Sequence, residues 1–136
     1  MEEEKLISVL LVSPNTEAKI VEIEENLDSM QELLGGDELD EYMPFDDDVA
    51  IVLCRKNQNK MLPNRAIYNE KNEIIDIIFG KFCICFAPLM SEKYLSLPQD
   101  LAKKYCEKFR NPEHFFKTNG GIKVVPFVPN EASEER

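Results

Sequence analysis

Apolar residues form short unbroken runs or alternate with polar ones along most of this chain, and both patterns are typical of β-strands. Residues 5–13 are an almost continuous run rich in Leu, Val and Ile, which predicts a central strand covered on both faces. In residues 18–24, Ile20 points one way while Val21 and Ile23 point the other. We therefore expect a half-buried strand there, paired with the first.

A helical spacing occurs once in the first half of the chain. Its apolar stripe consists of Leu27, Met30, Leu33 and Leu34. Asn26 is placed to cap the N-terminus of this helix with its side-chain oxygen. Gly35-Gly36 is expected to end it, because glycine adopts the left-handed conformation without a steric penalty.

A second helix is predicted in the last third of the chain. Its apolar face is formed, at intervals of four residues, by Leu97, Leu101, Tyr105 and Phe109. Ser96 and Gln99 have the spacing of a capping box with Ser96 as the cap, and Asn111-Pro112 ends the helix.

Further strands complete the pattern. They are predicted at residues 39–45, 49–54, 73–79, 81–87 and 122–127. Asp46–Asp48 is interpreted as a hairpin turn, and Gly80 indicates a bulge or a close approach of two backbones.

We predict an α+β fold, in which a mixed, mainly antiparallel sheet has two helices packed on it. It forms a single domain over residues 1–130, followed by a disordered acidic tail at 131–136.

Composition narrows the class of protein. With 136 residues, of which 43% are hydrophobic, the chain has enough apolar surface for one core. No run reaches the roughly 18 apolar residues that a membrane span needs. The acidic start, Met1–Glu4, is the opposite of the basic start of a signal peptide. We therefore expect a soluble, cytoplasmic protein with no membrane partner.

Four cysteines and one histidine limit the metal and redox chemistry. The cysteines lack the C-x-x-C spacing of a zinc site, and Asp46–Asp48 lacks the alternating spacing of a calcium loop. Cys83 and Cys85 point to the same face of a predicted strand. We interpret all four cysteines as free thiols acting as small core hydrophobes, and we expect no metal and no cofactor.

Charge is distributed unevenly along the chain. Residues 1–48 carry 16 acidic and two basic side chains, a net charge of −14, whereas residues 49–136 have a net charge of +4. The acidic half argues against direct binding of nucleic acid. It is either a solvated face or a surface for a basic partner. The carboxylates whose neutralisation would distinguish the two are Glu22, Glu24, Asp37, Glu38, Asp40 and Glu41.

Cationic and amide side chains gather between residues 55 and 65. The candidate ligand-binding residues are Arg65, Asn64, Arg55, Lys56 and Lys60. Guanidinium and ammonium groups bind phosphate, so this segment is either an anion or nucleotide site or an ordinary surface loop. Arg65 differs from the others because its neighbours are apolar, which predicts a fixed partner, either a carboxylate or a ligand.

Signatures of enzymes are missing from the sequence. There is no P-loop, dinucleotide glycine pattern, G-x-S-x-G elbow or H-E-x-x-H. A Cys–His pair would need His114, which lies beyond the last clear helix. Carboxylates are so abundant that no acid–base pair stands out. We predict no catalytic residue and no enzymatic activity.

Four motifs in combination resemble a known family. They are Leu27-x-x-Met30-Gln31-x-Leu33-Leu34-Gly35-Gly36, Asp47-Asp48-Val49-Ala50-Ile51, Asn64-Arg65-Ala66 and Asp76-x-Ile78-x-Gly80-x-Phe82. The similarity covers roughly residues 6–110 and is to a small domain of unknown function found in bacteriophages, prophages and conjugative elements. The resemblance implies an accessory protein of a phage or mobile element in the host bacterial cytoplasm. It carries over no activity.

Accessory proteins of that kind often counter host defences, so the leading hypothesis is a non-enzymatic counter-defence protein. One mechanism masks a host effector by protein binding through the acidic half. The other sequesters a small phosphorylated nucleotide at Arg65, in a pocket completed by homo-oligomerisation. The alternatives are an intracellular regulatory protein-interaction module, a DNA-mimic inhibitor and a small nucleotide-processing enzyme.

Overall fold

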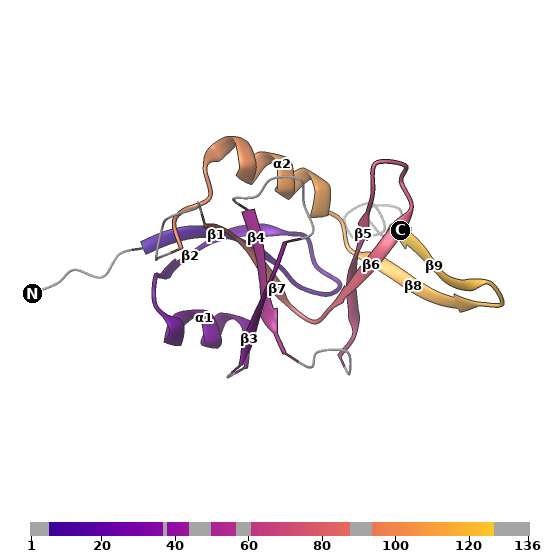
Figure 1. Cartoon of the computed structure of the whole chain (residues 1–136), viewed down its shortest axis with the longest axis horizontal. Helices are drawn as coiled ribbons and strands as arrows, with labels where there is room; N and C mark the ends of the chain where they lie inside the picture. Colours follow the sequence, from indigo (N-terminus) through magenta and orange to yellow (C-terminus); the bar gives the residue numbers. More distant parts are fainter. Residues whose placement is uncertain (1–5, 37, 44–49, 57–60, 88–93, 127–136) are drawn as a thin grey trace, which may run out of the picture.

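The computed structural model describes residues 6–36, 38–43, 50–56, 61–87 and 94–126. Its strands are β1 (Leu6–Val12), β2 (Lys19–Glu24), β3 (Leu39–Tyr42), β4 (Ala50–Arg55), β5 (Pro63–Tyr68), β6 (Ile74–Phe79), β7 (Phe82–Phe86), β8 (Glu113–Thr118) and β9 (Gly121–Pro126). Its helices are α1 (Leu27–Leu34) and α2 (Gln99–Phe109). The α+β class predicted from the sequence is confirmed (Figure 1).

A five-stranded sheet with the order β2-β1-β7-β4-β3 forms the centre of the molecule. Every pairing between named strands is antiparallel. The helices α1 and α2 lie on opposite sides of this sheet (Figure 1). Because both faces are covered, the middle strands are apolar throughout, as the sequence predicted for β1.

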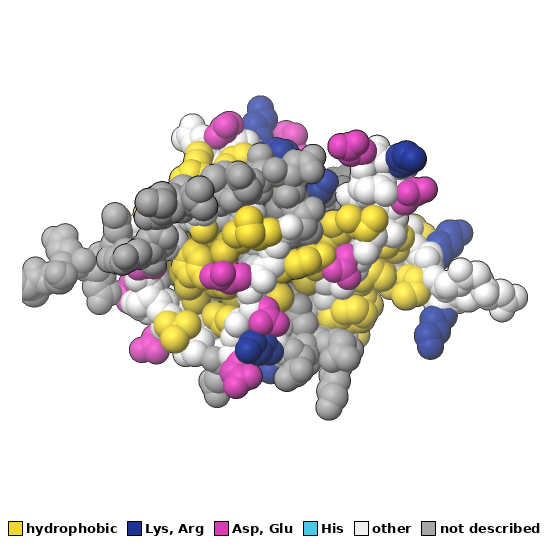
Figure 2. Space-filling view, viewed as in Figure 1, with side chains coloured by type: hydrophobic (Ala, Val, Ile, Leu, Met, Phe, Trp, Pro, Cys, Tyr) yellow, Lys and Arg dark blue, Asp and Glu magenta, His cyan; other side chains and the backbone are white. Residues whose placement is uncertain are grey.

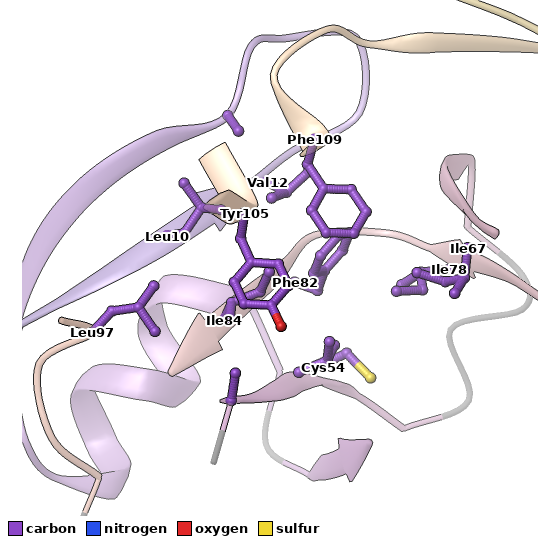
Figure 3. Close-up of a cluster of buried hydrophobic side chains, with 13 residues drawn as sticks. Leu10, Val12, Cys54, Ile67, Ile78, Phe82, Ile84, Leu97, Tyr105 and Phe109 are labelled. Atoms are coloured by element: carbon purple, nitrogen blue, oxygen red, sulfur yellow. The ribbon is translucent and has the colours of Figure 1, made fainter. Parts of the chain in front are cut away.

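Side chains of the middle strands alternate between two apolar layers. Phe82 and Ile84 of β7 pack on the side of α2, in a cluster that includes Tyr105 (Figure 3). Cys83 and Cys85 point to the other side and pack with α1. The expectation that these two cysteines share a face is therefore confirmed.

The cysteines of the chain are free thiols, and three of them are buried: Cys54, Cys83 and Cys85. The sulfur atoms of Cys83 and Cys85 lie 3.7 Å apart. Their hydrogen bond, together with burial, raises the pKa of the Cys83 thiol well above its ordinary value. Since the thiolate is the reactive form, these thiols should be inert in the folded protein.

We accordingly expect a thiol reagent to modify about one cysteine per native chain, namely the half-buried Cys106, and all four after denaturation. Mass spectrometry of samples quenched over minutes would count the modified thiols. Modification of three or four thiols at the same rate in native and denatured samples would contradict the expectation.

The ends of the two helices were predicted with different success. The side chain of Asn26 accepts a hydrogen bond from the backbone N–H of Ser29, and Gly35 is left-handed at the end of α1, both as expected. The prediction of a capping box at Ser96 is wrong. The N-cap of α2 is Pro98, without a side-chain cap, because the Ser96 hydroxyl accepts instead from the backbone N–H of Ser8.

Two hairpins extend from the sheet at the end of the molecule opposite α1 (Figure 1). The first is β5–β6, and Gly80, with a φ of 78°, turns the chain from β6 into β7 of the main sheet. The close approach of two backbones predicted at this glycine is confirmed, because its N–H donates to the backbone oxygen of Leu62 (2.9 Å). The second hairpin is β8–β9. Neither β5 nor β8 was predicted as a strand.

Several sequence predictions lie outside the described residues. These are the turn at Asp46–Asp48, the candidate ligand residue Lys60, the carboxylate of Asp37 and the tail at 131–136. Within the described part, no helix is long and apolar enough to cross a membrane.

Candidate functional site

Asn64 and Arg65 lie inside the protein, with exposed fractions of 0% and 1%. Strand β5 holds them, next to the bulge where its pairing with β6 shifts between Pro63 and Arg65. The Asn64 side-chain amide donates to the backbone oxygens of Val12 (3.0 Å) and Gly80 (2.8 Å). Asn64 therefore joins the end of β1 to the bend between β6 and β7.

The Arg65 guanidinium bonds to three separate parts of the chain. Nε donates to the backbone oxygen of Phe109 at the C-terminus of α2 (3.0 Å). Nη2 donates to the backbone oxygen of Thr16 (2.7 Å), and Nη1 to that of Ser13 (3.4 Å), both in the β1–β2 connection. Nη1 also donates to the side-chain oxygen of Asn64 (2.8 Å). Arg65 thus has fixed partners, but they are backbone carbonyls and the Asn64 side chain, whereas a carboxylate or a ligand was expected.

Position and charge suit Arg65 to this role. A cation is favoured at the C-terminal end of a helix, where the last carbonyls have no partner within the helix. Burial lowers the pKa of Arg65 to about 10, and the nearby Glu113 carboxylate opposes that shift, so the guanidinium stays charged at neutral pH. The sequence analysis did not single out Glu113, whose carboxylate also accepts from the backbone N–H of Ala66 (2.8 Å).

The remaining candidate cations lie elsewhere. Arg55 ends β4 and lies against Gly36, where an added Cβ would come within 2.4 Å of its Nε. Its Nη1 is 3.9 Å from the sulfur of Met61. Lys56 is exposed. The four candidates that the structure describes, Asn64, Arg65, Arg55 and Lys56, therefore form no common phosphate pocket, and ligand binding by the predicted residues stays a prediction.

The acidic half of the chain divides between the two edges of the main sheet. Glu22 and Glu24 are exposed on β2 at one edge. Glu38, Asp40 and Glu41 are exposed on or beside β3 at the other. A pocket lies beside the β3 edge, so its carboxylates are the stronger candidates for function.

This pocket has a volume of about 430 Å³ and lies between α1, β3 and β4. We call it the acidic pocket, and its lining residues are Leu27, Met30, Gln31, Leu39, Glu41, Leu53 and Tyr94. The leucines and the methionine form an apolar floor. Leu27, on the stripe predicted to be buried, is instead 62% exposed and is available at the rim. A volume of this size is typical of sites that accept a side chain or small ligand.

Tyr94 fixes one wall of the acidic pocket. Its hydroxyl donates to the carboxylate of Glu41, and its backbone N–H donates to the carboxylate of Glu25 (3.2 Å). Burial and the bond to Glu41 raise the pKa of the Tyr94 hydroxyl, so it remains a neutral donor. A carboxylate has about four acceptor positions, so the Glu41 carboxylate keeps capacity for a further donor, such as a cation.

Negative charge predominates around the acidic pocket, and a cation beside it is Arg55, directly across from Leu39 in the pairing of β3 with β4. Exposed carboxylates flank the lining residues in α1 and before β3, namely Asp28, Glu32 and Glu38, and neither α1 nor β3 contains a Lys or Arg. Figure 2 shows Asp and Glu side chains over this end of the molecule. Sequence reasoning identified the charge but missed the pocket. An apolar residue such as Leu39 between acidic neighbours was the available signal.

In the described part of the chain, no group of three His, Cys, Asp or Glu side chains could hold a metal ion. His114 lies exposed on β8, its ring 6.4 Å from that of Phe116.

These features define a small α+β protein with an acidic, apolar-floored pocket at a sheet edge. The chain belongs to the family described as a domain of unknown function, DUF3846, whose model matches residues 7–110. The matched region ends directly after α2, so β8 and β9 lie beyond it. Comparison with the curated proteins found no significant match, and comparison with the solved structures found none either.

Proposed function

We propose that this protein acts without catalysis, by binding a basic surface of a host protein at the acidic pocket. In that role it is an accessory protein of a phage or mobile element that counters host defence by masking an effector in the bacterial cytoplasm. The family motifs in the sequence support the setting. The observation that carries the binding mode is an apolar floor enclosed by carboxylates without a cation in α1 or β3.

The apolar floor favours binding of a protein surface over two alternatives, imitation of DNA and capture of a nucleotide. A surface that imitates DNA needs only spaced negative charge, whereas this pocket also offers Leu27 and Leu39 to an apolar side chain. A nucleotide signal would need unpaired cations, and the described donors of Arg65 are directed at backbone carbonyls. Burial of an apolar anchor inside a charged rim is the usual anatomy of a protein interface.

Three variants of the full chain test this proposal. A rim variant carries Asp28→Asn, Glu32→Gln and Glu38→Gln beside the pocket. A matched control carries Glu17→Gln, Glu22→Gln and Glu70→Gln, which change the net charge equally at exposed sites elsewhere. A floor variant carries Leu27→Gln, which keeps a good helix former while removing the exposed apolar contact. Each is purified from bacteria that carry a defence system blocked by the wild-type protein, and native mass spectrometry reports what remains bound.

We expect the wild type and the matched control to retain the same host protein. The rim variant should lose affinity about tenfold or more, because three favourable charge contacts disappear. The floor variant should also lose its partner. Normal retention by the floor variant together with loss in the rim variant would indicate a DNA mimic. Retention by both, or recovery of an intact nucleotide in place of a protein, would refute the proposal.

A further inference from the structure

The β8–β9 hairpin has a surface opposite in charge to the acidic pocket. Residues 113–126, which form the hairpin, carry the two basic side chains Lys117 and Lys123 and the acidic Glu113, a net charge of +1, whereas residues 17–43 have a net charge of −9. The hairpin also exposes apolar side chains. Ile122 and Phe116 are each 49% exposed, and Val125 is 38% exposed. This combination of cations and apolar groups is what the acidic pocket would accept.

Cations and exposed apolar side chains occur together at the end of the hairpin. Ile122 lies directly across from Lys117 in the pairing of β8 with β9, and Lys123 follows it in the chain. All three side chains are exposed. Ile122 and Lys117 therefore share one face at the end of a projecting two-stranded ribbon, and Lys123 lies on the other face beside Phe116; Figure 2 shows Lys and Arg side chains at this end.

We propose that the acidic pocket binds the β8–β9 hairpin of a second copy of this chain. Ile122 enters the apolar floor beside Leu27 and Leu39, while Lys117 and Lys123 meet the carboxylates of the rim. The hairpin and α1 lie at opposite ends of the molecule, so a chain does not fill its own pocket (Figure 1). The contact is consequently head-to-tail. Because it occupies the acidic pocket, it regulates access of the basic partner to that pocket.

Head-to-tail contacts join different surfaces of two copies, so each added copy presents one unused pocket and one unused hairpin. The formal net charge of −10 opposes association over long distances. At 0.15 M salt the screening length is about 8 Å, so the local opposite charges dominate over the remote like charges. We therefore expect concentration-dependent self-association at physiological salt.

Two variants separate the halves of this contact. The pocket variant carries Leu27→Lys and Glu38→Lys, which leave the hairpin intact. The hairpin variant carries Lys117→Glu, Ile122→Thr and Lys123→Glu, which leave the pocket intact. All five positions are exposed, and threonine keeps the β-branched shape that a strand favours. Unchanged thermal unfolding of each variant, within a few degrees, would establish that both are folded.

Sedimentation velocity of the purified chains gives the test. Wild type should form species larger than the 15.7 kDa monomer with rising concentration, and each variant alone should remain monomeric. An equimolar mixture of the two variants should form a one-to-one dimer, because one member keeps a working pocket and the other a working hairpin. A wild type that stays monomeric, variants that still associate, or a mixture without dimer would overturn the inference.

The inference rests on the proposed role of the acidic pocket as a binding surface, but it needs no host partner. Self-association tested with purified chains can therefore fail while partner retention by wild type and loss by the rim variant still hold. The reverse outcome, a head-to-tail dimer with no host protein retained, would refute the proposed function alone.

Discussion

Replacing Arg65 with alanine should destabilise the protein by about 3–5 kcal/mol, because the substitution removes hydrogen bonds to several carbonyl oxygens, leaves the buried one of Phe109 without this donor, and opens a cavity where a buried side chain was. Three of these oxygens belong to Phe109, Thr16 and Ser13, in segments far apart in the chain. A loss of this size is a large part of the roughly 5–15 kcal/mol that holds a domain folded. The corresponding fall in melting temperature is on the order of 10–20 °C.

Urea unfolding followed by circular dichroism would measure the effect. Arg65→Lys should recover little of the loss, since an ammonium group cannot reproduce the planar fork that reaches α2 and the β1–β2 connection together. The matched control is Arg55→Ala, at a half-buried arginine with a weak contact to the sulfur of Met61, and it should cost about 1 kcal/mol or less. Equal stability of Arg65→Ala and wild type would contradict the structural role of Arg65.

Replacing Phe82 with alanine should cost about 3–5 kcal/mol, since it removes a fully buried ring and leaves a cavity. The ring packs edge-on against Phe109, with 5.6 Å between centroids and an interplanar angle of 84°. Figure 3 shows it between the sheet and the side chains of α2. The same urea experiment measures the loss.

Phe116→Ala is the control for this substitution, because it removes the same ring from an exposed position on β8. We expect it to change the stability by roughly 0.5 kcal/mol or less. Similar effects of the two substitutions would mean that α2 does not cover the sheet at Phe82.

The central layers of the fold could be predicted from the sequence because burial on both faces leaves a clear signal. Continuous apolar runs predicted β1, β4 and β7 as strands, and β1 as a strand covered on both faces. The helix cap at Asn26 and the special backbone conformation at Gly80 could also be predicted from the sequence. These predictions depend on residues within a few positions of one another.

The rest depends on partners that are distant in sequence. Strand β5 was missed because Asn64 and Arg65 are polar, and the hydrogen bonds that allow their burial reach residues as far away in the sequence as Val12. Ser96 was misassigned as a cap since its partner, Ser8, is 88 residues away. The acidic pocket is formed by four separate segments, so neither its apolar floor nor the place of Tyr94 could be read from local patterns.

Chemical-shift mapping of the labelled protein with its recovered host partner locates the binding surface most directly. At 0.15 M salt, partner addition should shift the amide signals of the acidic pocket, with the largest changes near Leu27, Leu39 and Tyr94. The rim variant should lose these shifts, and the matched control should keep them. Shifts centred instead on Arg55, Lys56 and the segment leading to β5, with the acidic pocket unaffected, would contradict the account.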